Sequence, residues 1–182
     1  MAKLIFAMHL SLDGYVDDAG GNLVMPPPSD TLFQYWIDTV GAETGAIYGR
    51  RMYETMRYWD NDDPEWSDAF RAFAAAWQKQ RKWVVSQTLT EVGPNASLIT
   101  GDIEAQVRAI KDTVEGTVSV EGPQIAGLIS QFGLIDEYHL YYRPFVLGTG
   151  KPFFHDALPR LRLLGAERLD DETMRLSYAK GE

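Results

Sequence analysis

The chain lacks cysteine entirely and has only three histidines among its 182 residues. Without cysteine, disulfide bonds, thiol nucleophiles and cysteine-bound zinc are excluded. His9, His139 and His155 are too far apart in sequence for two of them to share one helical face as metal ligands. We therefore expect no metal site.

Basic residues are also scarce, because 17 lysines and arginines face 26 acidic residues, giving a net charge of −9. A nucleic-acid-binding protein needs a basic face, so nucleic acid is not an expected partner. A small anionic ligand is not excluded, since it contacts only the few arginines and backbone amides near it.

Long hydrophobic runs are missing as well. None approaches the roughly 18 apolar residues that a membrane span requires, and the opening segment, KLIFAM, has the pattern of a buried strand rather than of a leader. We therefore expect no membrane partner and a cytoplasmic location. The length and the hydrophobic fraction of 45% are typical of one globular domain, residues 1–182.

Apolar patterning predicts strands and helices in alternation. Strands are expected at residues 3–10, 46–48, 82–86, 97–100, 117–120 and 138–147, helices at 29–40, 52–58, 65–80, 102–114 and 124–132, and two closing strands at 160–167 and 174–180. This order predicts an α/β fold with a mostly parallel central sheet, helices on both faces, and antiparallel strands at the C-terminal end.

The segment Gly133–Phe154 organises the expected fold. Its apolar and polar residues alternate from Tyr138 to Arg143, and an unbroken apolar run follows at residues 145–147, as in a strand covered on both faces. Pro144 marks an edge position or a bend. Gly148 and Gly150 then allow a tight turn or the close approach of a ligand.

Three expected strands end in segments suited to an anionic ligand: Gly49–Arg51, Ser86–Thr88 and Glu121–Pro123. Ligands of open parallel sheets bind beyond the carboxyl ends of the strands, where helix N-termini offer amide donors. Arginine and hydroxyl side chains add donors for phosphate. The alternative is that the glycines only start helices and the arginines are solvated. No Gly-x-Gly-x-x-Gly motif follows the first strand.

Four segments, Ser11–Tyr15, Gly49–Glu54, Val84–Leu89 and Gly133–Phe154, resemble the dihydrofolate reductase-like superfamily. The branch that they resemble most is the C-terminal reductase domain of bifunctional riboflavin-biosynthesis deaminase-reductases. The resemblance implies a three-layer α/β/α fold and a homodimer. It also implies an NADPH-dependent reductase that acts on a small heterocyclic or carbonyl/imine substrate, such as 5-amino-6-(5-phosphoribosylamino)uracil.

The resemblance also implies a set of cofactor-binding residues. They are Gly49, Arg50 and Arg51 at a phosphate turn, Ser86, Gln87 and Thr88 at the adenosine 2′-phosphate, Gly122, Pro123 and Gln124 at the pyrophosphate, and Ala7 and Leu12 with Asp13 near the nicotinamide. Two positions depart from the family pattern. Met52 stands where threonine is usual, and Glu121 replaces the first residue of a Gly-Gly pair.

That glycine pair carries a cis peptide bond in dihydrofolate reductases. We therefore expect a cis bond at Glu121–Gly122, or one moved to Gly122–Pro123, where proline lowers its cost to about 0.5–1 kcal/mol. Glu121 also brings a negative charge close to the expected phosphate site.

Asp30 and Asp13 are the candidate proton donors. Asp30 lies in Pro28-Ser29-Asp30, which matches the position of the dihydrofolate reductase carboxylate. Both have structural alternatives, because Asp30 or Ser29 can cap a helix and Asp13-Gly14 is a turn sequence. Phe33 and Trp36 are candidate walls of a substrate pocket, although aromatic residues on a helix face usually pack in the core.

Two other functions stay open. One is a nucleotide-binding protein without catalysis, favoured by Met52 and Glu121, and the other is a true folate reductase, for which Met25-Pro26 is only a partial match. A full deaminase-reductase is excluded, because the zinc site of the deaminase needs cysteines. For the homodimer, the strand His139–Arg143 is the expected contact surface.

Overall fold

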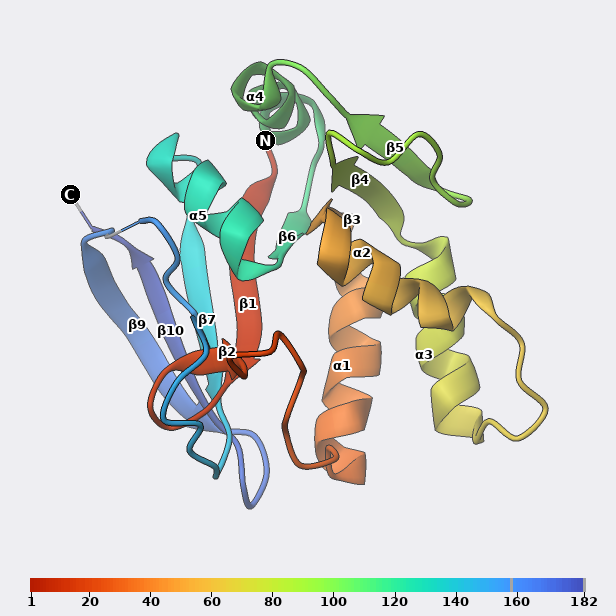
Figure 1. The fold of residues 1–182 in the computed structure, drawn as a ribbon, viewed down its shortest axis with the longest axis vertical. Helices are drawn as coiled ribbons and strands as arrows, with labels where there is room; N and C mark the ends of the chain where they lie inside the picture. The colour runs from red at the N-terminus through yellow and green to blue at the C-terminus, as the bar shows by residue number, and fades with distance from the viewer. Residues whose placement is uncertain (158, 182) are drawn as a thin grey trace.

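The computed structural model describes residues 1–157 and 159–181, which form three layers around one sheet (Figure 1). The elements are β1 (Lys3–Leu10), β2 (Tyr15–Asp17), α1 (Asp30–Ala42), β3 (Gly45–Gly49), α2 (Arg50–Met56), the 3₁₀ helix η1 (Arg57–Asp60), α3 (Asp68–Lys79), β4 (Arg81–Val85), β5 (Ala96–Ile99), α4 (Ile103–Thr113), β6 (Thr117–Glu121), α5 (Pro123–Gln131), β7 (Glu137–Tyr142), β8 (Lys151–Pro152), β9 (Leu161–Arg168) and β10 (Met174–Lys180).

Eight strands form the central sheet in the order β5-β4-β3-β6-β1-β7-β10-β9. The six strands from β5 to β7 run parallel, and β10 and β9 close the sheet in antiparallel pairing. β2 and β8 pair separately beside it. The expected α/β class, the mostly parallel sheet and the antiparallel C-terminal strands are thus confirmed.

Helices cover both faces of the parallel part of the sheet. α4 and α5 pack on one face, where Val118 and Val120 of β6 are fully buried with Ile129 of α5. α1, α2 and α3 cover the opposite face, where Tyr48 packs with Trp77. Because side chains alternate along a strand, each buried strand supplies apolar groups to both layers.

Side-chain caps set the start of three helices. The hydroxyl of Ser29 accepts a hydrogen bond from the Leu32 amide at the start of α1. Asp102 caps α4 in the same way through the Ala105 amide, as expected for polar residues that satisfy free amides in the first turn. Ser67 caps α3.

The strand β7 ends earlier than expected. It stops at Tyr142, and the apolar run at residues 145–147 lies outside the sheet, with Val146 67% exposed. Pro144 lacks an amide hydrogen and bends the chain away. The bend lets the amides of Leu147 and Gly148 donate to the carboxylate of Asp13, at 3.1 and 2.7 Å. The prediction of a strand covered on both faces there is wrong.

Two of the three tyrosines of β7 are buried. This strand lies between β1 and β10, and the side chains of Tyr138 and Tyr141 are 2% and 1% exposed. These two side chains are therefore not available to a partner subunit, while the role of the strand His139–Arg143 in a dimer stays a prediction. The outer edge of the sheet on this side is β9, where Leu163 and Leu164 are 56% and 45% exposed.

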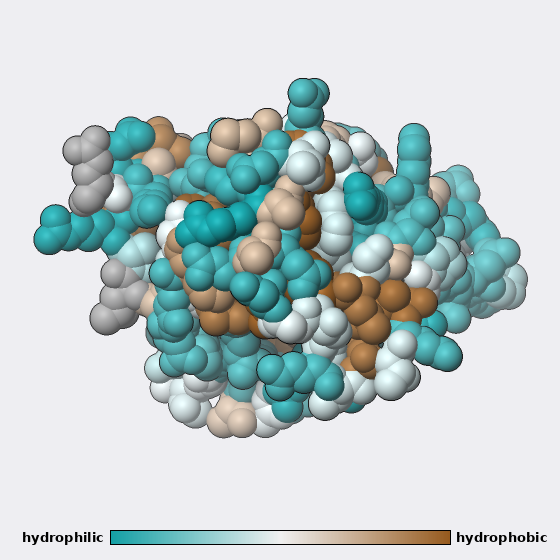
Figure 2. Space-filling model, turned by 90° about the horizontal axis from the view of Figure 1, so that it is seen from above, coloured by the Kyte–Doolittle hydropathy of each residue, from teal (hydrophilic) through white to brown (hydrophobic). Residues whose placement is uncertain are grey.

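The face of the molecule seen from above is mostly hydrophilic, and its hydrophobic residues lie in separate patches (Figure 2). No helix in residues 1–157 and 159–181 is long and apolar enough to cross a membrane.

Candidate functional site

A cleft of about 300 Å³ opens at the carboxyl ends of β3 and β6. Its walls come from β1, β2, the loop that follows β2, the β3–α2 turn, the β6–α5 turn and β8. Six of the residues expected to bind a cofactor line it: Gly49, Arg50, Arg51, Gly122, Pro123 and Gln124. The two glycine-containing turns, 73 residues apart between Gly49 and Gly122, therefore meet in one place.

The β6–α5 turn depends on Gly122. Its φ of +113° lies in a region that side chains disfavour, and a Cβ there would also contact Met52 at 3.7 Å. Pro123 begins α5, where its missing amide hydrogen costs nothing. The described residues contain no cis peptide bond, so the expected cis bond in this segment is wrong. The glycine dihedral makes the bend instead.

The β3–α2 turn packs directly on the β6–α5 turn. A Cβ on Gly49 would lie 3.4 Å from the Ile125 side chain and 3.9 Å from the Glu121 carbonyl oxygen. Because β3 and β6 are neighbouring parallel strands, their ends lie side by side. The close fit brings the Arg51 side chain into the same cleft as the first turn of α5.

Arg51 supplies positive charge to the cleft. Its side chain is exposed, and it forms no ion pair within residues 1–157 and 159–181. Its Nη1 lies near Gly21, where a Cβ would be 3.5 Å away, so the loop after β2 lies across it. An unpaired guanidinium beside free helix amides is suited to an anionic ligand.

Lys151 is a third cation in the cleft, after Arg50 and Arg51, and was not identified from the sequence. Its Nζ lies 3.1 Å from Oδ2 of Asp17, and its amide donates to Oδ1 of Asp17 at 3.2 Å. Gly150 permits this contact, because a Cβ there would be 2.0 Å from the Asp17 carbonyl oxygen. In the sequence, the only sign of a site near Lys151 was the glycine-rich segment that precedes it. Its ion pair with Asp17 forms because β2 and β8 pair with each other, which local sequence does not show.

Beside the cleft, Arg50 joins the segment that follows β4. Its Nη1 donates to Oγ1 of Thr88 at 2.7 Å. The hydroxyl of Ser86 accepts hydrogen bonds from the amides of Thr88 and Leu89, at 3.2 and 3.0 Å. β3 and β4 are parallel neighbours, which explains why these side chains meet. Gln87, also expected to bind the cofactor, is exposed next to them.

Several other expected residues lie outside the cleft. Ala7 points to the opposite face of β1 from Met8, which lines the cleft, and Leu12 is 59% exposed. Asp30 is exposed in the first turn of α1.

Asp13 holds the segment that follows β7 through hydrogen bonds to its carboxylate. Hydrogen bonds, first from Ser11 and then from the amides described above, lower its pKa, which favours an ionised carboxylate over a proton donor.

Phe33 and Trp36 take part in helix packing instead of lining the cleft. Phe33 stacks on Phe73 of α3 with ring centroids 5.5 Å apart. Trp36 meets Tyr141 edge-on at 4.6 Å and His9 at 5.0 Å. Burial, followed by the charge of the nearby Arg143, lowers the pKa of His9 to about 4, so this histidine is neutral at pH 7.

An acidic pair under the β6–α5 turn was also missed. Burial raises the pKa of Glu121 to about 7. Burial and the charge of Glu121 raise the pKa of Glu43 to about 8. One Glu43 oxygen accepts hydrogen bonds from Gln80 at 2.8 Å and Ser119 at 3.0 Å. Carboxyl groups that titrate near neutral pH can hold a proton and release it.

The comparison with known sequences identifies one family. The model of the RibD C-terminal domain matches residues 2–174. A curated relative is the uncharacterized protein YyaP of Bacillus subtilis (strain 168), which is 29% identical over 170 residues that make up 88% of this chain and 85% of YyaP.

Solved structures share the fold at lower identity. A putative riboflavin biosynthesis protein from Shewanella sp. PV-4 matches with a TM-score of 0.74 and 23% identity, covering 100% of both chains. The deaminase/5-amino-6-(5-phosphoribosylamino)uracil reductase of Thermotoga maritima matches with a TM-score of 0.67 and 14% identity over 99% of this chain and 57% of that one.

Dihydrofolate reductase from Enterococcus faecalis, complexed with NADP(H), matches with a TM-score of 0.66 and 10% identity over 99% of this chain and 97% of that one. At such identities the likeness establishes a dihydrofolate reductase-like fold, as the sequence predicts. Together with the family match over residues 2–174, it gives one conclusion: the chain belongs to the RibD C-terminal domain family.

Proposed function

We propose that this protein is an NADPH-dependent reductase. The observation that carries the proposal is the cleft at the ends of β3 and β6, in which two glycine turns and the unpaired Arg51 converge. The family match and the likeness to a dihydrofolate reductase complexed with NADP(H) support the choice of cofactor. Bound there, NADPH would supply a hydride.

The residues present fit a dinucleotide phosphate. In the proposal, the first amides of α5 beyond Gly122 and the guanidinium of Arg51 hold the pyrophosphate, because both offer donors to an anion. Arg50, Ser86 and Thr88 hold the adenosine 2′-phosphate with charge and hydroxyl groups. Gln87, at the same segment, contacts the adenosine end.

Glu121 is the proposed proton source. Its pKa of about 7 keeps part of it protonated at neutral pH. It directly precedes Gly122, which lines the cleft, while its own buried carboxyl group lies behind that turn near Ser119 and Glu43. It suits this role better than Asp13, whose pKa is lowered, and better than the exposed Asp30. The Glu121→Gln variant is expected to bind NADPH normally and to lose turnover, most strongly below pH 7.

The proposed substrate is a small heterocycle or a carbonyl or imine compound. A pyrimidine related to 5-amino-6-(5-phosphoribosylamino)uracil is the first choice, because the Thermotoga relative is named for its reduction. A folate is the second choice, suggested by the dihydrofolate reductase match. A nucleotide-binding protein without catalysis remains the alternative from another class, since Met52 replaces a phosphate-site hydroxyl.

Cofactor binding is tested first. Titration of NADPH, followed through the fluorescence of the five tryptophans, is expected to saturate for the wild type. Arg51→Ala is expected to weaken binding about tenfold or more, because a charge-assisted contact to phosphate contributes roughly 1.5–3 kcal/mol. Arg71→Ala is the control, since Arg71 is an exposed residue of α3 that pairs with the exposed Asp62 and does not line the cleft.

Absence of NADPH binding to the wild type would contradict the proposal. Turnover of NADPH with pyrimidine and folate substrates then separates the enzyme from the binding protein. Saturable binding without oxidation of NADPH by any of these compounds would favour the non-catalytic alternative.

We also propose a homodimer that forms through the face of β7, β10 and β9 left uncovered by helices. This face has a shallow hollow of about 370 Å³ lined by Gly165 and Ser177 beside the exposed Leu164. Light scattering should give twice the chain mass of 20.5 kDa. Leu164→Asp should give monomers. Val146→Asp, at an exposed position outside the sheet, is the control and should remain dimeric. A monomeric wild type would contradict the proposed homodimer.

A further inference from the structure

Arg50 is held by two partners from different elements. Its Nε lies 2.9 Å from Oε1 of Glu54, one turn later in α2, and its Nη1 donates to Oγ1 of Thr88 at 2.7 Å. Half of each charged side chain is accessible, at 50% for Arg50 and 43% for Glu54. The guanidinium is therefore positioned beside Ser86 and Thr88 but is already engaged by a carboxylate.

We propose that Glu54 determines specificity between NADPH and NADH. It competes with the adenosine 2′-phosphate for Arg50 and thereby weakens the preference for the phosphorylated cofactor. The inference rests on the proposed function, because it assigns a role within the proposed cofactor site.

The competition follows from the charges. A phosphate monoester carries about −1.5 to −2 charges at pH 7, and it needs the donors of the Arg50 fork for a bidentate contact. Glu54 occupies the Nε side of this fork. To bind Arg50, the phosphate must displace Glu54 or share the guanidinium with it, and two like charges then lie around one cation.

The other neighbours of Arg50 do not oppose the phosphate. Thr88 and Ser86 are neutral hydroxyl residues that can donate to it. Glu54 is the one acid that bonds or pairs with the Arg50 side chain within residues 1–157 and 159–181. NADH lacks the 2′-phosphate, so its binding is insensitive to this competition.

Glu54 lies outside the rest of the cleft. Arg50, Arg51, Met52 and Thr55 of the same helix line the cleft, whereas Glu54 does not. The Arg50–Glu54 pair is exposed and contributes little to folding, as is usual for surface pairs. Replacement of Glu54 is therefore expected to change cofactor choice without disturbing the fold.

The experiment compares NADPH and NADH titrations of the wild type and of Glu54→Gln at low ionic strength. We expect Glu54→Gln to lower the Kd for NADPH by about three- to tenfold, the range for relief of one partly exposed like-charge contact. The Kd for NADH should stay within about twofold. The preference for NADPH gained by the variant should shrink in 0.5 M salt, because exposed charges are screened.

Glu104→Gln is the matched control. Glu104 pairs with Arg108 on α4 at the same spacing of four residues and with the same accessibility, 43% for the acid and 52% for the arginine. Removal of the Glu104 charge should leave the Kd for NADPH and the Kd for NADH unchanged. In the Arg50→Ala background, Glu54→Gln should no longer change the ratio of the two affinities by more than about twofold, because the shared cation is gone.

The outcomes separate the two proposals. An unchanged or lowered preference for NADPH in Glu54→Gln, with both cofactors bound by the wild type, overturns the role of Glu54 and leaves the reductase assignment intact. Failure of the wild type to bind either cofactor overturns the proposed function itself.

Discussion

The cleft and the uncovered face of β7 and β10 differ in how completely their charged residues are paired. Two cations of the cleft are paired, Arg50 with Glu54 and Lys151 with Asp17, but within the described residues a third is not. In the cleft, Arg51 has no ion-pair partner in the part of the chain that the structure describes, and glycine turns leave helix amides accessible beside it. On the open face the charges are paired. Lys3 lies 2.7 Å from Glu137, and Arg175 pairs with Glu167.

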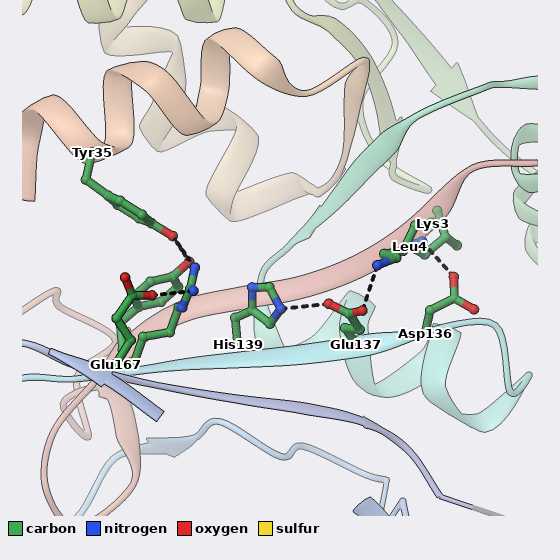
Figure 3. Close-up of polar contacts among 9 residues, drawn as sticks. Lys3, Leu4, Tyr35, Asp136, Glu137, His139 and Glu167 are labelled. Atoms are coloured by element: carbon green, nitrogen blue, oxygen red, sulfur yellow. Dashed lines mark hydrogen bonds and ion pairs between the residues drawn. The ribbon is translucent and has the colours of Figure 1, made fainter. Parts of the chain in front are cut away.

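The pairs of the open face form a row along the sheet (Figure 3). Glu137 contacts both Lys3 and His139, the latter at 3.0 Å, while Arg175 also donates to the hydroxyl of Tyr35 at 2.9 Å. Paired charges leave little net field to attract a small ion. In the proposed homodimer, such pairing would lower the repulsion between two copies of a chain with a net charge of −9.

The difference follows from position along the strands. Residues in the middle of a strand face partners on the next strand in fixed register, so opposite charges can pair. Residues just past the ends of parallel strands have no partner fixed by strand register, so a side chain there, such as that of Arg51, can stay unpaired beside a helix N-terminus. Charge by itself does not indicate a ligand site, whereas unpaired charge at strand ends does.

The largest expected effect comes from a substitution in the cleft. Gly122→Ala places a side chain at a φ of +113°, at a strain of about 1–3 kcal/mol. We expect NADPH binding to weaken at least about tenfold and the melting temperature to fall. Gly165→Ala on β9, where a Cβ meets nothing within 4 Å, is the control from the open face. Equal effects of the two substitutions would remove the distinction between the regions.

The second prediction concerns the pH dependence of stability. Glu43 has a folded-state pKa of about 8 against an ordinary value of 4.5, so between these values the folded state retains a proton that the unfolded state releases. The free energy of unfolding should fall as pH rises through this window, by at most about 1.4 kcal/mol per pH unit. Glu43→Gln should flatten the fall in denaturant titrations at pH 5–8.

Glu137 on the open face is expected to act with the opposite sign. Burial opposes its ionisation, but hydrogen bonds from Lys3 and His139 lower its pKa below the ordinary 4.5. Its contribution is therefore present above about pH 4.5 and is lost as pH falls further. Glu115→Gln, at an exposed residue, is the control for both acids. Glu121, with a pKa of about 7, contributes a fall of the same sign, so part of the slope should remain in Glu43→Gln; an undiminished slope at pH 5–8 would contradict the role of Glu43.

The smallest effect is expected on the open face. Lys3→Ala removes a partly exposed ion pair with Glu137, and such pairs contribute at most about 1 kcal/mol. Stability should fall by less than this amount, and NADPH affinity should not change. A large loss of NADPH affinity in Lys3→Ala would contradict the separation of the two regions.

Much of the fold was predictable because its signals are local. Ser29 and Asp102 lie where helices begin and cap them as expected. The glycine turns at Gly49 and Gly122 were also identified, since positive φ and helix entry leave a mark in sequence. The end of β7 was not predicted, because an apolar run such as residues 145–147 does not reveal whether a sheet covers it.

Within the candidate site, residues near strand ends were predicted better than residues brought in from elsewhere. Arg50 and Thr88 do meet, at 2.7 Å. Phe33 and Trp36 instead pack against α3 and β7, because helix-face aromatics bury more area in a core than in an open pocket. The binding roles of these residues remain predictions.

The sequence by itself determined the order of the main-sheet strands and of the helices, the caps at Ser29 and Asp102, and the glycine turns, because periodicity and backbone preference act over a few residues. Only the tertiary structure decided that the charge of Glu121 acts on Glu43, that Asp17 pairs with Lys151, and that Tyr138 and Tyr141 of β7 are buried. Those outcomes depend on which strands become neighbours, and burial, ion pairing and pKa all follow from contacts between segments far apart in the chain.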